Sequence, residues 1–152
     1  MNTKIITALI LMAAPFAFAG DLPLFELRLV AGTPSATTKE YSLPEHHGTS
    51  EKLLLESAVL FDAKALKSAQ VAADEDGNPS IAIQLTETAS EQFGEITTRN
   101  VSRRLGLIVA GQLRVAPVIR QAIWGGRLMI SGTFTAKEAA ELVSKLNGKK
   151  TP

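Results

Sequence analysis

Residues 80–146 constrain the fold more than any other part of the chain, because strand, helix and turn signals follow one another there in one readable order. Ile81, Ile83 and Leu85 alternate with smaller or polar residues, as in a strand with one buried face. An amphipathic segment comes next, opened by a capping threonine. Its buried positions are expected every four residues, at Ala89, Phe93, Thr97, Val101 and Leu105. This pattern predicts a helix that lies with one face on a sheet and ends at Gly106.

The second half of this stretch predicts a hairpin, a strand and a second helix. Apolar runs flank Ala110-Gly111, which indicates two strands joined by a tight turn, and another strand is expected at residues 128–130. Thr135 and Glu138 form a capping box that opens the last helix. The expected buried stripe of this helix is Ala136, Ala139, Ala140, Val143 and Leu146. The predicted fold is α+β, an antiparallel sheet with two helices packed on one face as a two-layer sandwich.

The start of the chain, up to Ala19, has the pattern of a signal peptide. Lys4 gives a positive start, residues 5–14 are apolar, and the small residues Ala17 and Ala19 precede Gly20. We expect cleavage between Ala19 and Gly20 and a periplasmic product. The alternative, an uncleaved membrane anchor, would need about 20 apolar residues, and this run is too short. No later stretch approaches that length, so we expect no transmembrane segment after signal removal.

The mature chain is expected to form one domain with one long loop. Alternation at residues 25–30 predicts a half-buried strand. Residues 31–50 lack both periodicities and carry several glycines and prolines, so they are predicted to be a mobile loop. Residues 52–61 are the next strand candidate, although their leucine run could equally open a helix. Residues 20–58 would then hold a strand, a long loop and a second strand, continuous with an α+β domain at residues 59–148.

Composition limits the classes of partner. The chain has sixteen basic and fifteen acidic residues, and one basic residue lies in the signal segment, so the mature domain is balanced in charge. Because nucleic-acid binding normally needs a strong basic excess on one face, we expect no nucleic-acid partner. Arg99, Arg103 and Arg104 end the predicted helix behind three glutamates, and we interpret them as a solvated helix face. There is no cysteine, so the core must stabilise the fold without disulfides.

No cluster of side chains points to catalysis or to a metal. His46-His47 is the only histidine pair, and neighbours on an extended chain point in opposite directions, which favours a polar loop over a metal site. Asp74 and Asp76 resemble the start of a calcium loop, but the glycine comes one place early and the closing glutamate is missing. Without a nucleophile beside a base or a phosphate loop, we expect no enzymatic activity, no cofactor and no metal.

Trp124 is the candidate for contact with a partner, together with Arg127. It stands beside Gly125-Gly126, and tryptophan is enriched at binding hot spots because it offers a large rigid surface. The competing interpretation is that Trp124 folds onto the edge of the core. That interpretation is favoured, because tryptophan is largely buried on average.

Several short phrases occur in the order found in the head subdomain of the first periplasmic domain of SecD, a subunit of the bacterial protein-export machinery. They are Val59-Leu60-Phe61-Asp62, Asp76-Gly77-Asn78-Pro79, Ile81-Ala82-Ile83, the helix phrase from Phe93 through Ile96-Thr97 and Asn100-Val101 to Arg104-Leu105, Ala116-Pro117-Val118-Ile119, and Ile130-Ser131-Gly132-Thr133-Phe134-Thr135. The chain from Val59 to Asn147 therefore resembles the SecD head.

The resemblance implies a head-like α+β fold and a periplasmic binding module without enzymatic activity. It would contact exported polypeptide or the translocation apparatus. SecD couples protons through charged residues in its membrane helices, which have no counterpart in this sequence, so motor activity is not implied. The alternative is an envelope interaction protein that binds one specific folded partner. A broad preference for extended peptides would favour the first function, and one stoichiometric partner the second.

Overall fold

The computed structural model of the protein describes residues 22–46, 49–132 and 134–148. The predicted signal peptide, with its cleavage site after Ala19, lies outside the described residues, and so does His47. Within the described part of the chain, no helix is both long enough and apolar enough to cross a membrane.

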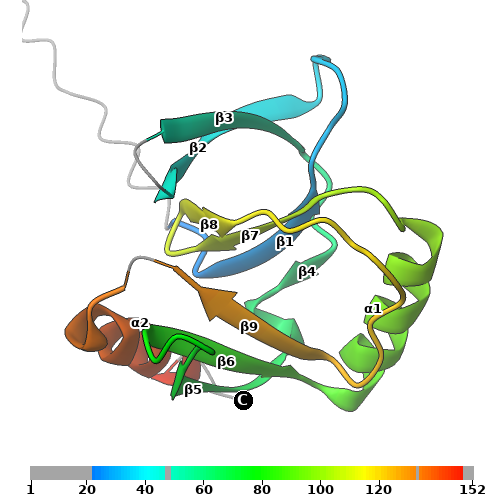
Figure 1. The fold of residues 1–152 in the computed structure, drawn as a ribbon. Coiled ribbons are helices and arrows are strands. Elements are labelled where there is room, and N and C mark those ends of the chain that lie inside the picture. Colours follow the sequence, from blue (N-terminus) through cyan, green and yellow to red (C-terminus); the bar gives the residue numbers. More distant parts are fainter. Residues whose placement is uncertain (1–21, 47–48, 133, 149–152) are drawn as a thin grey trace, which may run out of the picture.

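Antiparallel strands dominate the described part of the chain and form three sheets (Figure 1). The sheets have the strand orders β4-β1-β7-β8, β2-β3 and β5-β6-β9. The strands are β1 (Phe25–Leu29), β2 (Thr38–His46), β3 (Thr49–Glu56), β4 (Phe61–Asp62), β5 (Leu66–Ala73), β6 (Pro79–Leu85), β7 (Leu105–Val109), β8 (Gln112–Val115) and β9 (Arg127–Ser131). The helices are α1 (Glu87–Arg99), α2 (Ala136–Gly148) and a short 3-10 turn, Ala63–Ala65. The predicted α+β class is confirmed, although the strands are divided among several sheets.

The main core lies between the β4-β1-β7-β8 sheet, the β5-β6-β9 sheet and the two helices. Alternate residues of β1 point into it, as the sequence predicts, and Phe25 and Leu27 are almost fully buried. Phe93 of α1 is fully buried, and its ring meets the ring of Phe61 edge to face with centroids 5.9 Å apart. α2 packs against β5 and β6. The sheets and both helices therefore share one apolar interior.

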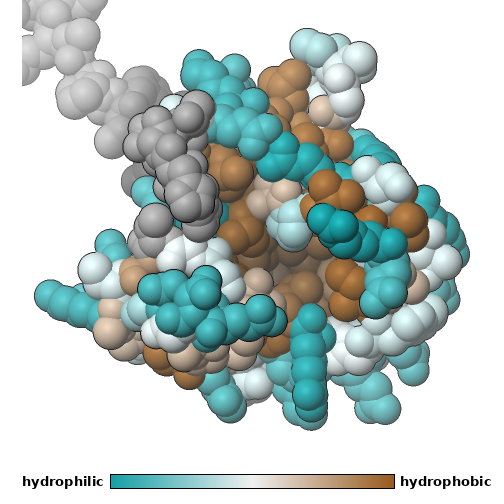
Figure 2. Space-filling model, in the orientation of Figure 1, coloured by the Kyte–Doolittle hydropathy of each residue, from teal (hydrophilic) through white to brown (hydrophobic). Residues whose placement is uncertain are grey.

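A second, smaller core lies on the other face of the β4-β1-β7-β8 sheet, against the β2-β3 hairpin. Its buried members are Leu53, Leu55, Ile108, Leu113 and Ala116. β7 contributes Ile108 to this core and Leu107 and Val109 to the main core, so every residue of β7 is buried. Figure 2 shows apolar surface in the hollow between the hairpin and β9, framed by hydrophilic side chains.

The prediction of a mobile loop at residues 31–50 is wrong, because β2 lies within it and pairs with β3. Tyr41 and Leu43 are half-buried and alternate with exposed Ser42, which is the period of a strand. Pro44 stands in a two-stranded sheet, where each strand is an edge strand and proline is tolerated. The hairpin is held by the second core, which the local sequence pattern does not reveal.

Helix α1 is shorter than predicted. The side chain of Thr86 caps its first turn, and the helix ends at Arg99. Val101 is exposed, and Leu105 and Gly106 lie in β7. The predicted stop at Gly106 is therefore wrong. The four-residue repeat continues past the helix because Leu105 reaches the core from a strand.

The capping box of α2 is present, but its buried face differs from the prediction. Thr135 N donates to Glu138 Oε2 at 2.8 Å, and Glu138 N donates to Thr135 Oγ1 at 3.2 Å. The hydrogen bonds from the backbone and side chain of Thr135 hold the pKa of Glu138 below its ordinary value. Ala136 and Ala140 are exposed, contrary to the prediction. The buried residues of α2 are Ala139, Leu142 and Leu146.

The hairpin predicted at Ala110-Gly111 joins β7 and β8, and its turn has an unusual backbone conformation. Ala110 has φ 51° and Gly111 has φ 77°, so both central residues lie in the left-handed region. This is the geometry of a type I′ turn, in which asparagine or aspartate normally precedes glycine.

Ala110→Asn should therefore raise the melting temperature by a few degrees. Alanine in the left-handed region costs on the order of 1 kcal/mol, and one kcal/mol corresponds to roughly 4 °C or less for a domain of this size. Thermal denaturation followed by circular dichroism measures the change. Ala110→Val is the contrast, because a β-branched side chain is disfavoured at positive φ and should lower the melting temperature. An unchanged or lower melting temperature for Ala110→Asn would contradict this description of the turn.

Arg103 and Arg104, interpreted from the sequence as part of a solvated helix face, lie beyond α1 and hold the β2-β3 hairpin. Arg104 Nη1 and Nη2 donate to the two carboxylate oxygens of Glu51 at 2.6 and 3.0 Å, and Arg103 pairs with Glu56. Arg104 Nε also donates to the carbonyl oxygen of Ala116 at 2.9 Å. The side-chain hydrogen bonds from Arg104 lower the pKa of Glu51 from its ordinary 4.5.

The free energy of unfolding of Glu51→Gln should be lower than that of the parent at neutral pH, by no more than about 1 kcal/mol because the pair is exposed to solvent. The carboxyl has a lower pKa folded than unfolded, so its ionised form stabilises the fold above pH 4.5 and this stabilisation is lost as the pH falls through the folded pKa. Urea denaturation of both proteins across this range should show the difference shrinking at acid pH. A difference that stays constant would contradict the ion pair.

Candidate functional site: the outer face of the β5-β6-β9 sheet

The β5-β6-β9 sheet has one face in the main core and one face that carries three rows of side chains. Ile81, Ile83 and Leu85 of β6 point into the core, so the residues between them point outward. The strand pairing gives a first row of Ser68, Gln84 and Arg127, a second of Gln70, Ala82 and Met129, and a third of Ala72, Ser80 and Ser131.

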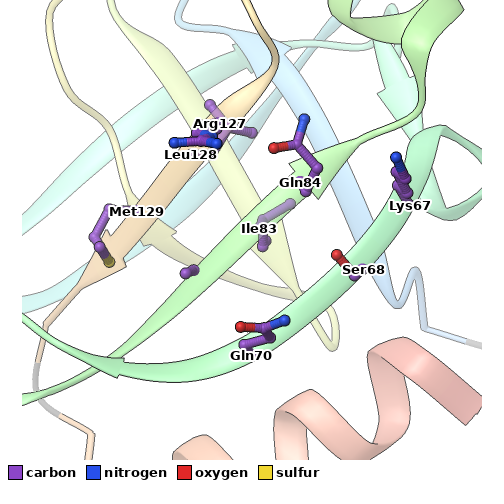
Figure 3. Close-up of a pocket in the computed structure, with 9 residues that line it drawn as sticks. Lys67, Ser68, Gln70, Ile83, Gln84, Arg127, Leu128 and Met129 are labelled. Carbon is purple, nitrogen blue, oxygen red and sulfur yellow. The ribbon is translucent and has the colours of Figure 1, made fainter.

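An open cavity of about 610 Å³ lies over the first two rows (Figure 3). Lys67, Gln84 and Arg127 lie across the three strands at one end of it, and Met129 and Gln70 lie farther along the sheet. None of the described residues that line it is acidic. The lining combines two cations, side-chain amides and a flexible thioether.

A second cavity, of about 500 Å³, continues the outer face to the other end of the sheet, where the turn between β5 and β6 is acidic. Glu75 and Asp76 line it, and Met129 borders both cavities. Asp74 Oδ1 accepts hydrogen bonds from Asp76 N at 3.1 Å and Asn78 N at 2.8 Å, so Asp74 forms the turn itself. The outer face therefore has a basic end and an acidic end.

The two edges of this sheet differ. At the β5 edge, Ala69 N donates to Asn147 Oδ1 at 3.0 Å, and Asn147 Nδ2 donates to the carbonyl oxygen of Ala69 at 2.8 Å. The amide of Asn147 thus takes the place that a neighbouring strand would occupy. β9 is the other edge, and it pairs only with β6 among the described strands. The backbone groups on its outer edge pair with no other described strand, and β9 also lies close to β8.

Trp124 lies just before β9, in a segment that is hydrogen-bonded to α1 and to β6. Ile123 N donates to the buried Thr97 Oγ1 at 2.9 Å, and Gln84 Nε2 donates to the carbonyl oxygen of Gly125 at 2.8 Å. A Cβ atom on Gly94 would lie 2.1 Å from Trp124 Cε3, so the indole ring rests directly on the backbone of α1. Trp124 nevertheless keeps 62% of its surface exposed.

Arg127 lies on the outer face of the sheet, whereas Trp124 precedes β9 and rests on α1. The favoured expectation is that Trp124 folds onto the edge of the core and is largely buried; its ring does rest on the buried Gly94 of α1, but the expected burial is wrong because most of its surface is in solvent. Arg127 begins β9 and lines the larger cavity. Sequence reasoning missed Lys67, Gln84 and Met129, which reach the same face only through the strand register. Gln84 could have been found, because it stands between the buried positions of a predicted strand.

The described residues contain no group of three or more histidine, aspartate or glutamate side chains that could hold a metal ion. His46 is the last residue of β2. In the acidic turn, the carboxylate of Asp74 accepts hydrogen bonds from backbone N–H groups of the same turn.

Comparisons with known proteins agree with this architecture. A sequence model of the SecDF P1 head subdomain matches residues 38–150. The chain is 32% identical over 98 residues to "Protein translocase subunit SecD" of Acidaminococcus fermentans, covering 64% of this chain and 24% of the relative. It is 38% identical over 100 residues to the protein of the same name from Aquifex aeolicus, covering 66% of this chain and 20% of the relative. The chain thus spans less than a quarter of the length of these relatives.

Two solved structures share the fold. One, described as "Structure and function of a membrane component SecDF that enhances protein export", has a TM-score of 0.66 and 25% identity, covering 84% of this chain and 63% of that one. The other, "Crystal structure of SecDF in Super-membrane-facing form", also has a TM-score of 0.66, with 26% identity, and covers 82% of this chain and 18% of that one. The resemblance seen in the sequence is therefore confirmed: the chain belongs to the SecDF P1 head subdomain family.

Proposed function

We propose that this chain is a periplasmic, non-enzymatic module that binds exported polypeptide in an extended conformation along β9 and the outer face of the β5-β6-β9 sheet. The observation that carries the proposal is the difference between the sheet edges: Asn147 occupies the β5 edge, whereas β9 pairs on one side only among the described strands. The family supports the setting, because the relatives are named as subunits of a protein translocase.

The proposed binding mode uses backbone groups first. An extended segment that adds beside β9 gains hydrogen bonds that every polypeptide offers, so little sequence preference is needed. Its alternate side chains would lie over the outer face, near Arg127 and Met129. Trp124, fixed on α1 at the start of β9, would contact an apolar side chain there. Affinity should be about micromolar or weaker, because ordering a flexible chain offsets much of the contact energy.

Export is part of the proposal. The signal segment would be cleaved between Ala19 and Gly20, leaving the domain in the periplasm. The intact mass of the protein recovered from the periplasmic fraction measures this. A protein that keeps the signal segment and sediments with the membrane would contradict it.

Strand addition can be separated from other binding modes with methylated peptides. In an added strand, only every second backbone N–H points toward β9. A peptide N-methylated at alternate residues in one phase should lose binding, and the same peptide methylated in the other phase should keep it. Fluorescence anisotropy of labelled peptides reports both. Equal effects of the two phases would exclude addition to β9.

The proposed preference for unfolded polypeptide is tested by titrating the mature protein with a secretory polypeptide in its unfolded form and in its folded form. We expect binding to the unfolded form only, weakened by roughly tenfold in Trp124→Ala, as for an exposed aromatic contact. Val59→Ala is the matched control, because Val59 is also exposed but lies beside β4. Binding of a single folded partner instead would favour an envelope interaction protein.

A further inference from the structure

The two ends of the outer face carry opposite charge, and no ion pair among the residues that the structure describes neutralises either end. Lys67 and Arg127 form no ion pair within the described residues, and neither do Glu75 and Asp76. Asp74 is excluded from this set because its carboxylate accepts the hydrogen bonds of the turn. Each end therefore presents charges that a ligand can neutralise.

The two ends act separately on a ligand. β9 runs from Arg127 to Ser131, beside the acidic turn, and four residues of extended chain span about 13 Å. This length exceeds the Debye length of about 8 Å at physiological ionic strength. A charged side chain of a bound segment therefore interacts mainly with the charges at the nearer end of the sheet, and the opposite charges at the far end are screened.

From this we infer that the outer face sets the direction in which an extended polypeptide lies on it, with an acidic side chain over Lys67 and Arg127 and a basic side chain beside Glu75 and Asp76. The inference rests on the proposed function. Because side chains of a strand alternate between its faces, the two charges must be an even number of residues apart, about four or six. The residues between them meet Ala82 and Met129, which favours small or apolar side chains.

The direction can be read from two peptides of identical composition. One carries an acidic residue near its N-terminus and a basic residue four positions later, and the other has the two charges exchanged. Each carries a nitroxide spin label at its N-terminus. Backbone amide spectra then show which end of the sheet is broadened, the β9 residues near Arg127 or the turn at Glu75 and Asp76.

The label should move from the Arg127 end for the first peptide to the acidic turn for the second, with a roughly threefold to tenfold preference in each case, the range expected for two solvent-exposed ion pairs. The double variant Arg127→Glu with Asp76→Lys should abolish the preference, because the remaining Lys67 and Glu75 offset the two introduced charges. Lys145→Glu, on exposed α2, should leave the preference unchanged. The preference should vanish in 1 M salt, where the Debye length is about 3 Å.

Two results overturn the inference, and they are distinguishable. If both peptides bind and the label stays at one end, or divides equally between the ends, charge does not set direction, and the proposed function stands without it. If neither peptide binds, the proposed function fails and the inference fails with it.

Discussion

Replacing Phe93 by alanine should lower the free energy of unfolding by about 3–5 kcal/mol, the range for a fully buried phenylalanine. The Phe93 side chain is fully buried, and its ring packs edge to face on Phe61 between α1 and the main core. Chemical denaturation at constant pH measures the change. Phe93→Leu, which keeps an apolar side chain in place, should lose less, and the exposed neighbour Gln92→Ala should change little. A loss below about 1 kcal/mol would place α1 outside the core, contrary to the packing described here.

Leu55→Ala should destabilise the protein by about 2–5 kcal/mol and loosen the β2-β3 hairpin first. Leu55 is fully buried in the second core, where its Cδ2 lies 2.7 Å from the position that a Cβ of Gly106 would take. Native-state hydrogen exchange should show faster exchange in β2 and β3 than in β6 and α2, because the buried apolar contacts of the hairpin are made in the second core. Leu54→Ala is the matched control on the other face of β3. Uniform acceleration across the chain would indicate that the two cores unfold as one.

The elements that the sequence predicts correctly have local signals. β6 follows from the two-residue alternation of isoleucine and leucine, and the β7-β8 turn follows from Gly111, one of the two central residues at positive φ. The start of α2 follows from the capping box of Thr135 and Glu138. In each case the residues that decide the structure stand within a few positions of one another.

The incorrect predictions concern elements whose structure depends on contacts with residues far away in the sequence. β2 has few apolar side chains, and it is a strand because Tyr41 and Leu43 pack on Leu53 and Leu113 from other parts of the chain. The predicted end of α1 is wrong because a helix and a strand explain the burial of Leu105 equally well.

The candidate site also depends on residues that are far apart in the sequence. Trp124 and Arg127 could be selected from residue type and neighbouring glycines, but the exposure of Trp124 depends on Gly94, thirty positions earlier in the chain. Lys67 and Arg127 are sixty positions apart and share a cavity only because β5 and β9 flank β6. Predicting this surface would have required the strand order of the sheet, which local patterns do not contain.

Backbone amide chemical-shift mapping of the mature protein during titration with an unfolded secretory polypeptide tests the central claim most directly. The account predicts that the shifts concentrate in β9, at the indole N–H of Trp124 and at the outer-face residues Gln84 and Gln70, while α2 and the β2-β3 hairpin stay unchanged. Shifts confined to α2 or the hairpin, or no shifts with a polypeptide that is shown to stay unfolded, would contradict it.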